Sequence, residues 1–270
     1  MEAYSVLMTI YKKDNCADAR AGIDSMLAQT VLTDDFVMVC DGPLTEELDG
    51  MLREYEKAYP EIFRVCRLEK NVGLGAALRH GVTLCKNELV ARMDNDDLSR
   101  PERCEMELKY LEDHPEVAMV GAHVSEFDED PAKPLRIKEV PVGKEAIERF
   151  SRRRNPFNHS TVLFRKSAVL AAGNYSEMRT NQDVDLWVRM LRKGHRCENL
   201  DEVLVDFRFD ANTLQRRKDW KNSKLLIEVW KSFRKEGYCS YGDYLFVKWM
   251  QIAIFVMPKG LLNWVYDHLR

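Results

Sequence analysis

Three carboxylates in the segment Asp94-Asn95-Asp96-Asp97 directly follow a hydrophobic run over residues 88–93. Neighbouring carboxylates repel one another unless a cation or hydrogen-bond donors compensate their charge. Mg²⁺ and Mn²⁺ prefer oxygen ligands of this kind, usually one or two carboxylates together with substrate phosphates. The segment therefore indicates a site for a divalent cation and a phosphorylated ligand, although a solvated acidic turn before the next helix explains the same residues.

A second pair of carboxylates, Asp183 and Asp185, lies in the segment NQDVDLWVRM at the start of an amphipathic helix. Such carboxylates are stabilised by the helix dipole and by free backbone N–H groups, so capping alone explains them. The functional interpretation makes one of them a general base within reach of a substrate hydroxyl. Since an unperturbed Asp has a pKa of about 3.9, its carboxylate accepts a proton at neutral pH without prior deprotonation.

Other polar residues of interest stand alone. Asp41, Asn71 and Gly73 follow apolar runs and have a simple structural role in turns. A lone histidine such as His159 is more often structural than catalytic. The arginine run 152–154 is explained by a solvated helix face, although it can also attract phosphate. None of these residues indicates a site by itself.

The first 130 residues alternate apolar, β-rich runs with helical patterns, which is typical of an α/β fold with a mostly parallel sheet covered by helices. Three of the expected strands end in polar or acidic residues. Because ligands of open α/β sheets bind outside the carboxyl ends of the strands, we expect these residues to line one site. The expected strands are residues 4–11, 36–40, 62–68 and 88–93, and the expected helices between them are residues 17–29, 44–58 and 74–86.

The remaining residues continue the α/β pattern and end in a helical tail. The loop 128–134, with two prolines, is the expected structural boundary, and the arginine run 152–154 is expected on a helix. The sequence predicts an α/β domain over residues 1–210 and a helical tail over residues 211–270. The further expected elements are a helix over 101–113, a strand or strand pair over 117–127, a helix opening at 181, a last strand over 203–209 and helices from about 213 to 270.

Composition and charge limit the possible classes of protein. Apolar residues make up 45% of the 270 residues, which provides a sizeable core and excludes collagen, a coiled-coil array and a disordered tail. Residues 1–130 carry 14 Lys/Arg against 28 Asp/Glu, whereas residues 131–270 carry 27 against 16. So large an asymmetry indicates a function that handles charge. The motifs GxGxxG and GxxxxGK[ST] are missing, which disfavours a Rossmann dehydrogenase and a P-loop kinase.

Cysteine spacing and the termini bear on the compartment. The seven cysteines lie 19 or more positions apart without a CxxC pair, so we expect reduced, mostly buried thiols in a cytosolic protein. The N-terminus lacks the pattern of a secretion signal, so we expect no export. The apolar stretch 245–257 has 13 residues, fewer than the ~20 that a membrane span needs. It is expected to form a buried or an interfacial helix.

In their order along the chain, these motifs resemble those of the family 2 glycosyltransferases, nucleotide-sugar enzymes with the GT-A fold, over about residues 4–210. The segment NPFNHSTVLFRKSAVL is similar to a subgroup of bacterial enzymes of capsule, exopolysaccharide and O-antigen assembly. The resemblance implies a Rossmann-like, mostly parallel GT-A sheet flanked by helices. The other matching segments are SVLMTIYKKD, VCDG, KNVGLGAALRHG, RMDNDD and NQDVDLWVRM.

The resemblance implies roles for four residues in binding the nucleotide. Thr9 and Tyr11 stand where the family contacts the nucleotide base, and Asp41 stands where an acid binds uracil or its equivalent. Asn71 belongs to the Asn-x-Gly turn of the same site. UDP is the first choice of nucleotide because Asp41 and Thr9 match that pocket, while TDP and GDP donors occur in similar enzymes.

The resemblance also implies the residues of the reaction centre. Asp94 is directed toward the ribose and Asp96 toward the metal, Mn²⁺ or Mg²⁺, with both as candidate metal ligands. Asp183 is the implied base, and His159 and Asp185 are expected near the donor sugar or the acceptor. The implied activity is an inverting transfer of sugar from a nucleotide-diphosphate sugar to a saccharide or polyprenyl-diphosphate-linked acceptor.

The sequence departs from the family pattern at several positions. Gln182 replaces the Glu that usually precedes the base, Arg79 stands where many relatives carry Asn, and Asp210 occupies the position of a metal-binding His. The segment QRRKDW over residues 215–220 has the wrong spacing for the QxxRW of processive synthases, so addition of a single sugar is expected.

The tail carries 11 Lys/Arg against 5 Asp/Glu, with aromatic residues such as Trp249, Phe255, Trp264 and Tyr266 between them. Basic, aromatic helices of this kind can lie in a lipid interface. Because members of the family that the chain resembles often act on lipid-linked sugars, we expect a cytoplasmic protein attached peripherally to the inner leaflet. The alternative is that these helices pack on the catalytic domain or form a homodimer contact.

Two other functions remain open at this stage. A scaffold or binding subunit that retains the fold is kept in consideration by Gln182 and Asp210. A nucleotidyltransferase also uses strand-end acids and a metal, but it should carry a Gly-rich, basic loop after the first strand, where YKKDNCAD lacks glycine. We expect no nucleic-acid partner.

Overall fold

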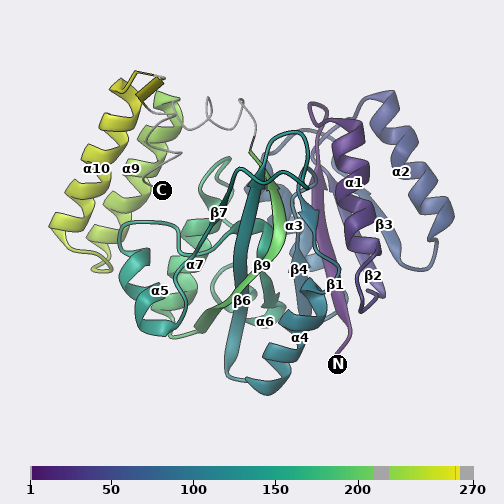
Figure 1. Cartoon of the computed structure of the whole chain (residues 1–270), viewed down its shortest axis with the longest axis horizontal. Coiled ribbons are helices and arrows are strands. Elements are labelled where there is room, and N and C mark those ends of the chain that lie inside the picture. The colour runs from purple at the N-terminus through teal and green to yellow at the C-terminus, as the bar shows by residue number, and fades with distance from the viewer. Residues whose placement is uncertain (1, 210–218, 259, 262–270) are drawn as a thin grey trace.

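The computed structural model describes residues 2–209, 219–258, 260 and 261. Within these residues, one sheet is flanked by helices on both faces (Figure 1). The strands are β1 (Tyr4–Ile10), β2 (Asp35–Cys40), β3 (Phe63–Arg67), β4 (Leu89–Arg92), β5 (Leu98–Ser99), β6 (Val117–Phe127), β7 (Arg136–Lys138), β8 (Leu163–Arg165) and β9 (Arg196–Arg208). The helices are α1 (Cys16–Leu27), α2 (Glu46–Ala58), α3 (Leu74–Leu84), α4 (Arg103–Asp113), α5 (Lys144–Ser151), the 3₁₀ turn η1 (His159–Thr161), α6 (Lys166–Ala171), α7 (Gln182–Arg192), α9 (Trp220–Lys235) and α10 (Tyr241–Val256).

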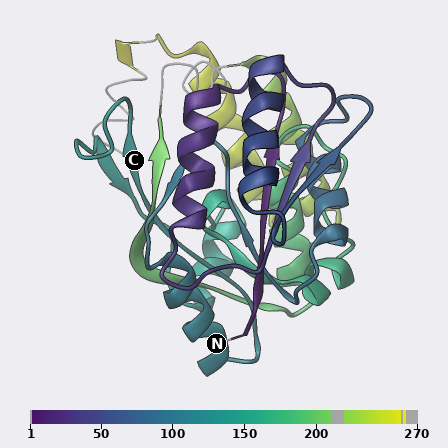
Figure 2. The ribbon, with the colours of Figure 1, turned by 90° about the vertical axis from the view of Figure 1, so that its right-hand side faces the viewer.

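The alternation of side chains along the strands explains why helices cover both faces. In β1, Val6 and Met8 join a core with α1, α2 and α4, whereas Leu7 joins a core with α3, α6 and α7. In β2, Met38 belongs to the first core and Val37 to the second. Figure 2 shows α1 and α2 side by side over the first face. Because successive side chains of a strand point to opposite faces, apolar strands produce two cores.

The strand order is β3-β2-β1-β4-β8-β6-β9-β5, with β7 paired to β6. The pairs β2–β3, β1–β2 and β1–β4 are parallel, whereas β8 is antiparallel to both β4 and β6. The long strands β6 and β9 are again parallel to each other. The α/β class predicted from the sequence is confirmed, and the carboxyl ends of β1, β2, β3 and β4 lie at one edge of the sheet.

Three expectations about the second half of the chain are wrong. The loop 128–134 is not a structural boundary, because β6 before it and β9 after it pair in the same sheet. The last strand begins at Arg196 rather than at 203; pairing with the buried strand β6 extends it through a polar sequence. The arginine run 152–154 lies in the turn after α5, since the helix ends before the Asn155-Pro156 pair.

The helices α9 and α10 pack against α7 rather than standing apart. Val184 and Val188 of α7 form a third apolar cluster with Trp230 and Phe233 of α9 and Val247 of α10. Packing on the α/β domain is therefore one role of these helices. The other predicted roles, a lipid interface and a homodimer contact, stay predictions.

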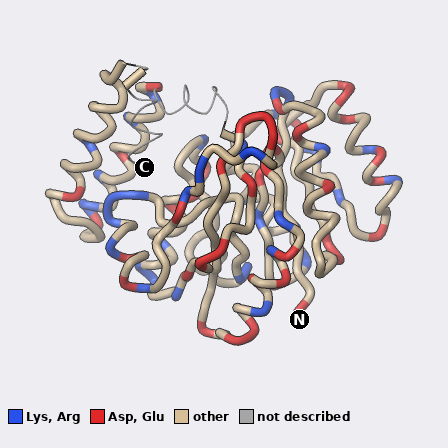
Figure 3. Tube along the Cα trace, viewed as in Figure 1, with Lys and Arg blue, Asp and Glu red and all other residues tan. Residues whose placement is uncertain are grey.

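Polar contacts tie the same helices to the basic turn after α5. Trp230 Nε1 donates a hydrogen bond to the carbonyl of Arg152 at 2.8 Å, and Arg153 Nε donates to Asp243 at 2.6 Å. Figure 3 shows this basic stretch on the side of the molecule where α9 and α10 lie. Two members of the arginine run thus help to dock the tail.

Several predictions fall on residues outside the described ranges. They are Asp210, the tail's start at residue 213, most of QRRKDW, Trp264 and Tyr266. The division at 210/211 therefore stays a prediction. Among the described residues, no helix combines the length and the apolar character needed to cross a membrane. All seven cysteines are free and five are buried, as expected.

Candidate functional site

A cavity of about 450 Å³ lies at the carboxyl edge of the parallel strands. Residues that end or follow β1, β2, β3 and β4 meet in its wall, which confirms that the polar strand ends share one site. Its lining contains the predicted residues Thr9, Tyr11, Asp41, Asn71, Asp94, Asp96 and His159, together with Ile10, Asp14, Gly73, Leu74, Arg92, Asn95, Arg179 and Phe207. The lining does not include the predicted residues Asp183 and Asp185.

Asp41, which follows β2, accepts hydrogen bonds from the Asn-x-Gly turn that follows β3. Its carboxylate accepts hydrogen bonds from the backbone N–H groups of Val72 at 2.7 Å and Gly73 at 3.0 Å, and from Asn71 Nδ2 at 2.8 Å. Gly73 has a φ of +95°, a conformation that L side chains rarely adopt. The second strand's acid and the Asn-x-Gly turn are thus one structural unit at the wall of the cavity.

The acidic segment after β4 is held by pairs of side chains. Arg92 is fully buried and forms a bidentate ion pair with Asp94. Asn95 Nδ2 donates to Asp14 at 2.6 Å, which connects the segment to the loop after β1. The half-buried Asp96 directly follows Asp94 and Asn95 along the chain and lies in the cavity lining. The segment is therefore a fixed part of the wall rather than a solvated turn.

Helix α1 approaches this segment very closely at Gly22. A Cβ on Gly22 would lie 2.6 Å from the backbone oxygen of Asn95 and 3.1 Å from that of Asp97. Asp97 is fully buried, and one of its carboxylate oxygens accepts from the backbone N–H of Arg208 at 2.9 Å. Burial raises the pKa of Asp97 well above its usual range, and the nearby Asp96 and Asp94 add to the effect.

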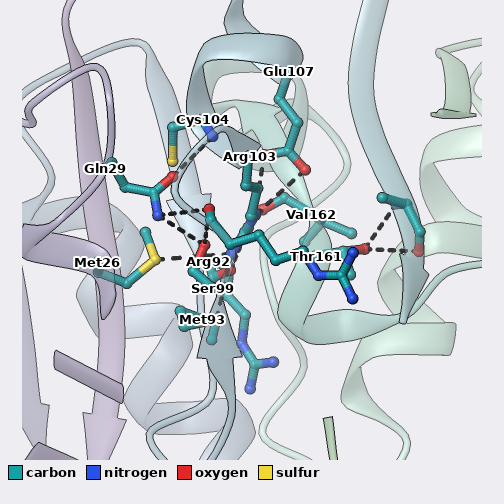
Figure 4. A network of polar contacts seen from close by, with 12 residues as sticks. Met26, Gln29, Arg92, Met93, Ser99, Arg103, Cys104, Glu107, Thr161 and Val162 are labelled. Atoms are coloured by element: carbon teal, nitrogen blue, oxygen red, sulfur yellow. Dashed lines mark hydrogen bonds and ion pairs between the residues drawn. The ribbon is translucent and has the colours of Figure 1, made fainter. Parts of the chain in front are cut away.

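Behind the cavity, a buried arginine connects β4 to the segment of η1 and β8 (Figure 4). Arg103 Nη2 donates to the carbonyl of Arg92 at 2.8 Å and to that of Val162 at 3.4 Å. Its Nε pairs with the fully buried Glu107 at 3.2 Å. Burial raises the pKa of Glu107 to about 8, while the charge of Arg103 opposes that shift. The network fixes the backbone directly before Asp94.

Asp183 lies in the first turn of α7, as expected, and is partly exposed. Asn155 Nδ2 donates to its carboxylate at 2.6 Å. Burial raises the pKa of Asp183, whereas the backbone N–H of Val184 and the charge of Arg92 lower it. A desolvated carboxylate held by one amide is suited to accept a proton.

His159 connects the cavity to the interior below α7. Its Nε2 shares a hydrogen bond of 3.0 Å with the hydroxyl of Tyr175, and its ring lies edge-on to Trp187 with centroids 5.8 Å apart. Burial lowers the pKa of His159 well below its usual range, and the charge of Arg92 lowers it further. His159 is therefore a neutral hydrogen-bonding group in the wall.

Asp185 pairs with an arginine of its own helix and does not belong to the cavity lining. Its carboxylate pairs with Arg189 one turn later at 2.8 Å, and Arg189 in turn donates to the carbonyl of Asn174 at 2.8 Å. These contacts brace α7 against the segment before it. The predicted sugar contact of Asp185 stays a prediction.

Sequence reasoning missed several lining residues, among them Arg92, Asp14, Arg179 and Phe207. Arg92 had a signal, because a charged residue interrupts the hydrophobic run directly before the acidic segment. Arg179 had none, since it lies in a loop more than a hundred residues away from the turn that it contacts.

The carboxylates in the cavity wall fit a divalent cation that is bound in part by the protein and in part by a phosphorylated ligand. The described residues contain no cluster of three or more His, Cys, Asp or Glu side chains arranged to enclose a metal ion. Asp94 and Asp96 instead present carboxylates in the cavity wall. One or two carboxylates completed by phosphate oxygens and water are a usual Mg²⁺ site.

Comparisons with known proteins agree with this geometry. The model of the family "Glycosyl transferase family 2" matches residues 5–173. The chain is 34% identical to the amylovoran biosynthesis glycosyltransferase AmsE of Erwinia amylovora, over 99% of both chains. It is 33% identical to the UDP-Gal:alpha-D-GlcNAc-diphosphoundecaprenol beta-1,3-galactosyltransferase of Escherichia coli, over 97% of this chain and 94% of that enzyme.

Solved structures share the fold at low sequence identity. The mannosyltransferase PcManGT from Pyrobaculum calidifontis, solved with GDP-Man and Mn²⁺, matches with a TM-score of 0.68 and 15% identity, over 96% of this chain and 72% of that chain. S. aureus TarS 1–349 in complex with UDP matches with a TM-score of 0.61 and 15% identity, over 98% and 87%. These likenesses confirm the predicted GT-A fold class.

Proposed function

Because the chain belongs to glycosyl transferase family 2 and is a glycosyltransferase, we propose that it transfers one sugar, with inversion, from a UDP-sugar to a lipid-linked saccharide. The observation that carries the proposal is the cavity in which the strand-end residues converge, with Arg92 acting on both Asp94 and Asp183. The proposed setting is the synthesis of a cell-surface polysaccharide.

The donor nucleotide is proposed to lie along the carboxyl ends of β1, β2 and β4. Thr9 and Tyr11 are assigned to the base, with Asp41 and Asn71 in the wall beside them. Asp94 is assigned to the ribose. The choice of UDP is supported by the E. coli relative, whose name specifies UDP-Gal, and by the structural neighbour with bound UDP.

Asp96, with Asp94, would hold Mn²⁺ or Mg²⁺ beside the diphosphate. The metal, when bound, neutralises the negative charge that builds on the leaving diphosphate. Support comes from the acidic wall, in which Asp14, Asp41, Asp94 and Asp96 face only two guanidinium groups among the lining residues. Such a wall accepts a diphosphate only if a further cation compensates it.

Asp183 is proposed as the general base. Its carboxylate takes the proton of the acceptor hydroxyl while that oxygen attacks the anomeric carbon from the face opposite the diphosphate, which inverts the configuration. The raised pKa makes the carboxylate a stronger base, and Asn155 fixes its orientation. The preceding Gln182 is buried and uncharged, so it does not compete for the proton.

The sugar and the acceptor are proposed to contact His159. Its neutral ring can hydrogen-bond a hydroxyl group, and it carries no positive charge that would attract the diphosphate. A lipid-linked acceptor is supported by the E. coli relative, whose name specifies a diphosphoundecaprenol acceptor. We further propose that the protein is cytoplasmic and that α10 contacts the membrane surface, because it exposes Trp249, Phe255 and Val256.

The test uses purified full-length protein, Mn²⁺, a panel of UDP-sugars and a synthetic GlcNAc-diphospho-lipid as acceptor. We expect transfer from one UDP-sugar and loss of both transfer and metal-dependent UDP binding in Asp96→Ala. Metal-dependent UDP binding without transfer or donor hydrolysis across the panel would favour a binding subunit instead. No nucleotide binding at all would refute the assignment of the cavity.

A further inference from the structure

The loop over residues 176–181 crosses the Asn-x-Gly turn at very short distance. A Cβ on Gly75 would lie 2.2 Å from the backbone oxygen of Ser176 and 2.4 Å from that of Met178. A Cβ on Gly73 would lie 2.8 Å from Cγ of Arg179. Two glycines therefore make room for this loop, and the stem of Arg179 lies in the space that Gly73 leaves.

The head group of Arg179 reaches the cavity from this position. Arg179 Nη1 donates a hydrogen bond to Asn71 Oδ1 at 2.9 Å, and Arg179 is itself part of the cavity lining. A guanidinium has five N–H donors and no acceptor. Within the described residues, the bond to Asn71 leaves most of these donors available, and the side chain is exposed.

The acids and amides around Arg179 are already engaged. The Asp41 carboxylate has about four acceptor sites, and it accepts from Asn71 Nδ2 and from the backbone N–H groups of Val72 and Gly73. Asp41 is only 7% exposed. Asp41 and Asn71 are therefore engaged in holding the turn, whereas Arg179 still offers donors toward a ligand in the cavity.

The second guanidinium of the lining cannot take this role. Arg92 is fully buried and is bound to Asp94 through both terminal nitrogens. Arg179 lies instead beside Asn71, which the proposed function places, together with Asp41, in the wall beside the residues assigned to the nucleotide base.

We propose that Arg179 reads the nucleobase of the donor by donating a hydrogen bond to a ring carbonyl oxygen, and so selects uracil over cytosine. The inference rests on the proposed function, because it takes the cavity to bind a nucleoside diphosphate. Uracil and cytosine differ at position 4, where uracil carries a carbonyl oxygen and cytosine an amino group. A donor-only guanidinium pairs with the first and leaves two donors opposed in the second.

The test measures binding of UDP and of CDP by titration calorimetry in the presence of Mn²⁺. We expect the wild-type protein to bind UDP at least about tenfold more tightly than CDP, because the hydrogen bond to the ring carbonyl is made with uracil and lost with cytosine. In Arg179→Met, whose stem still fills the space over Gly73, UDP binding should weaken about tenfold while CDP binding stays unchanged. Arg179→Lys should weaken UDP binding less than Arg179→Met does, because an ammonium is also a donor without an acceptor but has a shorter reach.

Arg53→Met is the matched control, since Arg53 is an exposed arginine on α2 that pairs only with Asp49 among its ion-pair contacts in the described residues. It should leave both affinities unchanged. Equal weakening of UDP and CDP in Arg179→Met would place the contact on the phosphates or ribose and overturn the inference. Unchanged UDP binding would overturn it as well. If the wild-type protein binds neither nucleotide, the proposed function itself fails.

Discussion

The two sides of the candidate site are held in place by different means. On the donor side, Asp41 is fixed by backbone N–H groups of the turn after β3, within the parallel half of the sheet. On the side of the proposed general base, Asp183 is fixed by the side chain of Asn155 and His159 by that of Tyr175. The comparison teaches that Asp41 on the proposed donor side is held by one backbone turn, whereas the proposed general base depends on side-chain contacts between distant parts of the chain.

The largest effect should come from Asp183→Asn, which separates the two sides. Transfer should fall by roughly 10²–10⁴-fold because the proposed general base is lost. Metal-dependent UDP binding should persist, since Asp183 does not line the donor cavity. Parallel measurements of turnover and of UDP affinity check this. Near-normal turnover would remove Asp183 as the base.

The same variant should change how stability depends on pH. Burial raises the folded-state pKa of Asp183, so the folded protein holds this proton more tightly than the unfolded chain does. Stability contributed by the protonated group is therefore lost as pH rises from the unfolded pKa, about 3.9, through the raised folded value. Asp183→Asn should be more stable than wild type at neutral pH in urea unfolding, with the difference shrinking toward pH 4. A variant less stable at pH 7 would contradict this sign.

The next largest effect is expected at Arg103, which connects the two sides. It donates to the carbonyl of Arg92 on the donor side and to that of Val162 beside η1, and it pairs with buried Glu107. Arg103→Met should lower the free energy of unfolding by about 3 kcal/mol, because Glu107 is left buried without its cation. The double variant Arg103→Met/Glu107→Leu should recover part of that loss. Equal stability of the single and double variants would show that the ion pair does not cause the effect.

The difference between local turns and distant packing also explains which site residues can be predicted from the sequence. Asp41, Asn71 and the acidic segment follow hydrophobic runs, so the rule that parallel strands end at one edge places them together. The position of Arg179 depends instead on how a loop packs on two glycines, which no local pattern encodes.

Errors about secondary structure have a similar cause. The first part of β9 is polar and looks like a loop, but pairing with the buried β6 makes it a strand. The basic run after α5 has helical composition, but a proline two residues beyond it ends the helix first. Tertiary pairing and chain stiffness decide these cases, and neither follows from the pattern of apolar residues.

A smaller effect is expected at Gly75, where α3 touches the loop before α7. Gly75→Ala places a methyl group 2.2 Å from the backbone oxygen of Ser176, so the loop before α7 must shift. Unfolding free energy should fall by about 1–3 kcal/mol, and turnover should fall more than UDP affinity because the loop leads into the helix of Asp183. Gly50→Ala is the control, because nothing lies within 4 Å of its added Cβ. A loss confined to UDP affinity would mean that the loop serves the donor side alone.

The smallest effect is expected on the outer face of α10, far from both sides. Trp249 is 60% exposed, so Trp249→Ser should leave unfolding and turnover on a soluble acceptor unchanged. Binding to anionic liposomes should weaken by up to about tenfold, since full burial of an apolar side chain contributes about 1.5–3 kcal/mol and interfacial burial is partial. Tyr59→Ser, at an exposed aromatic residue after α2, should not alter liposome binding. Equal binding by wild type and Trp249→Ser would limit α10 to its packing on α9 and α7.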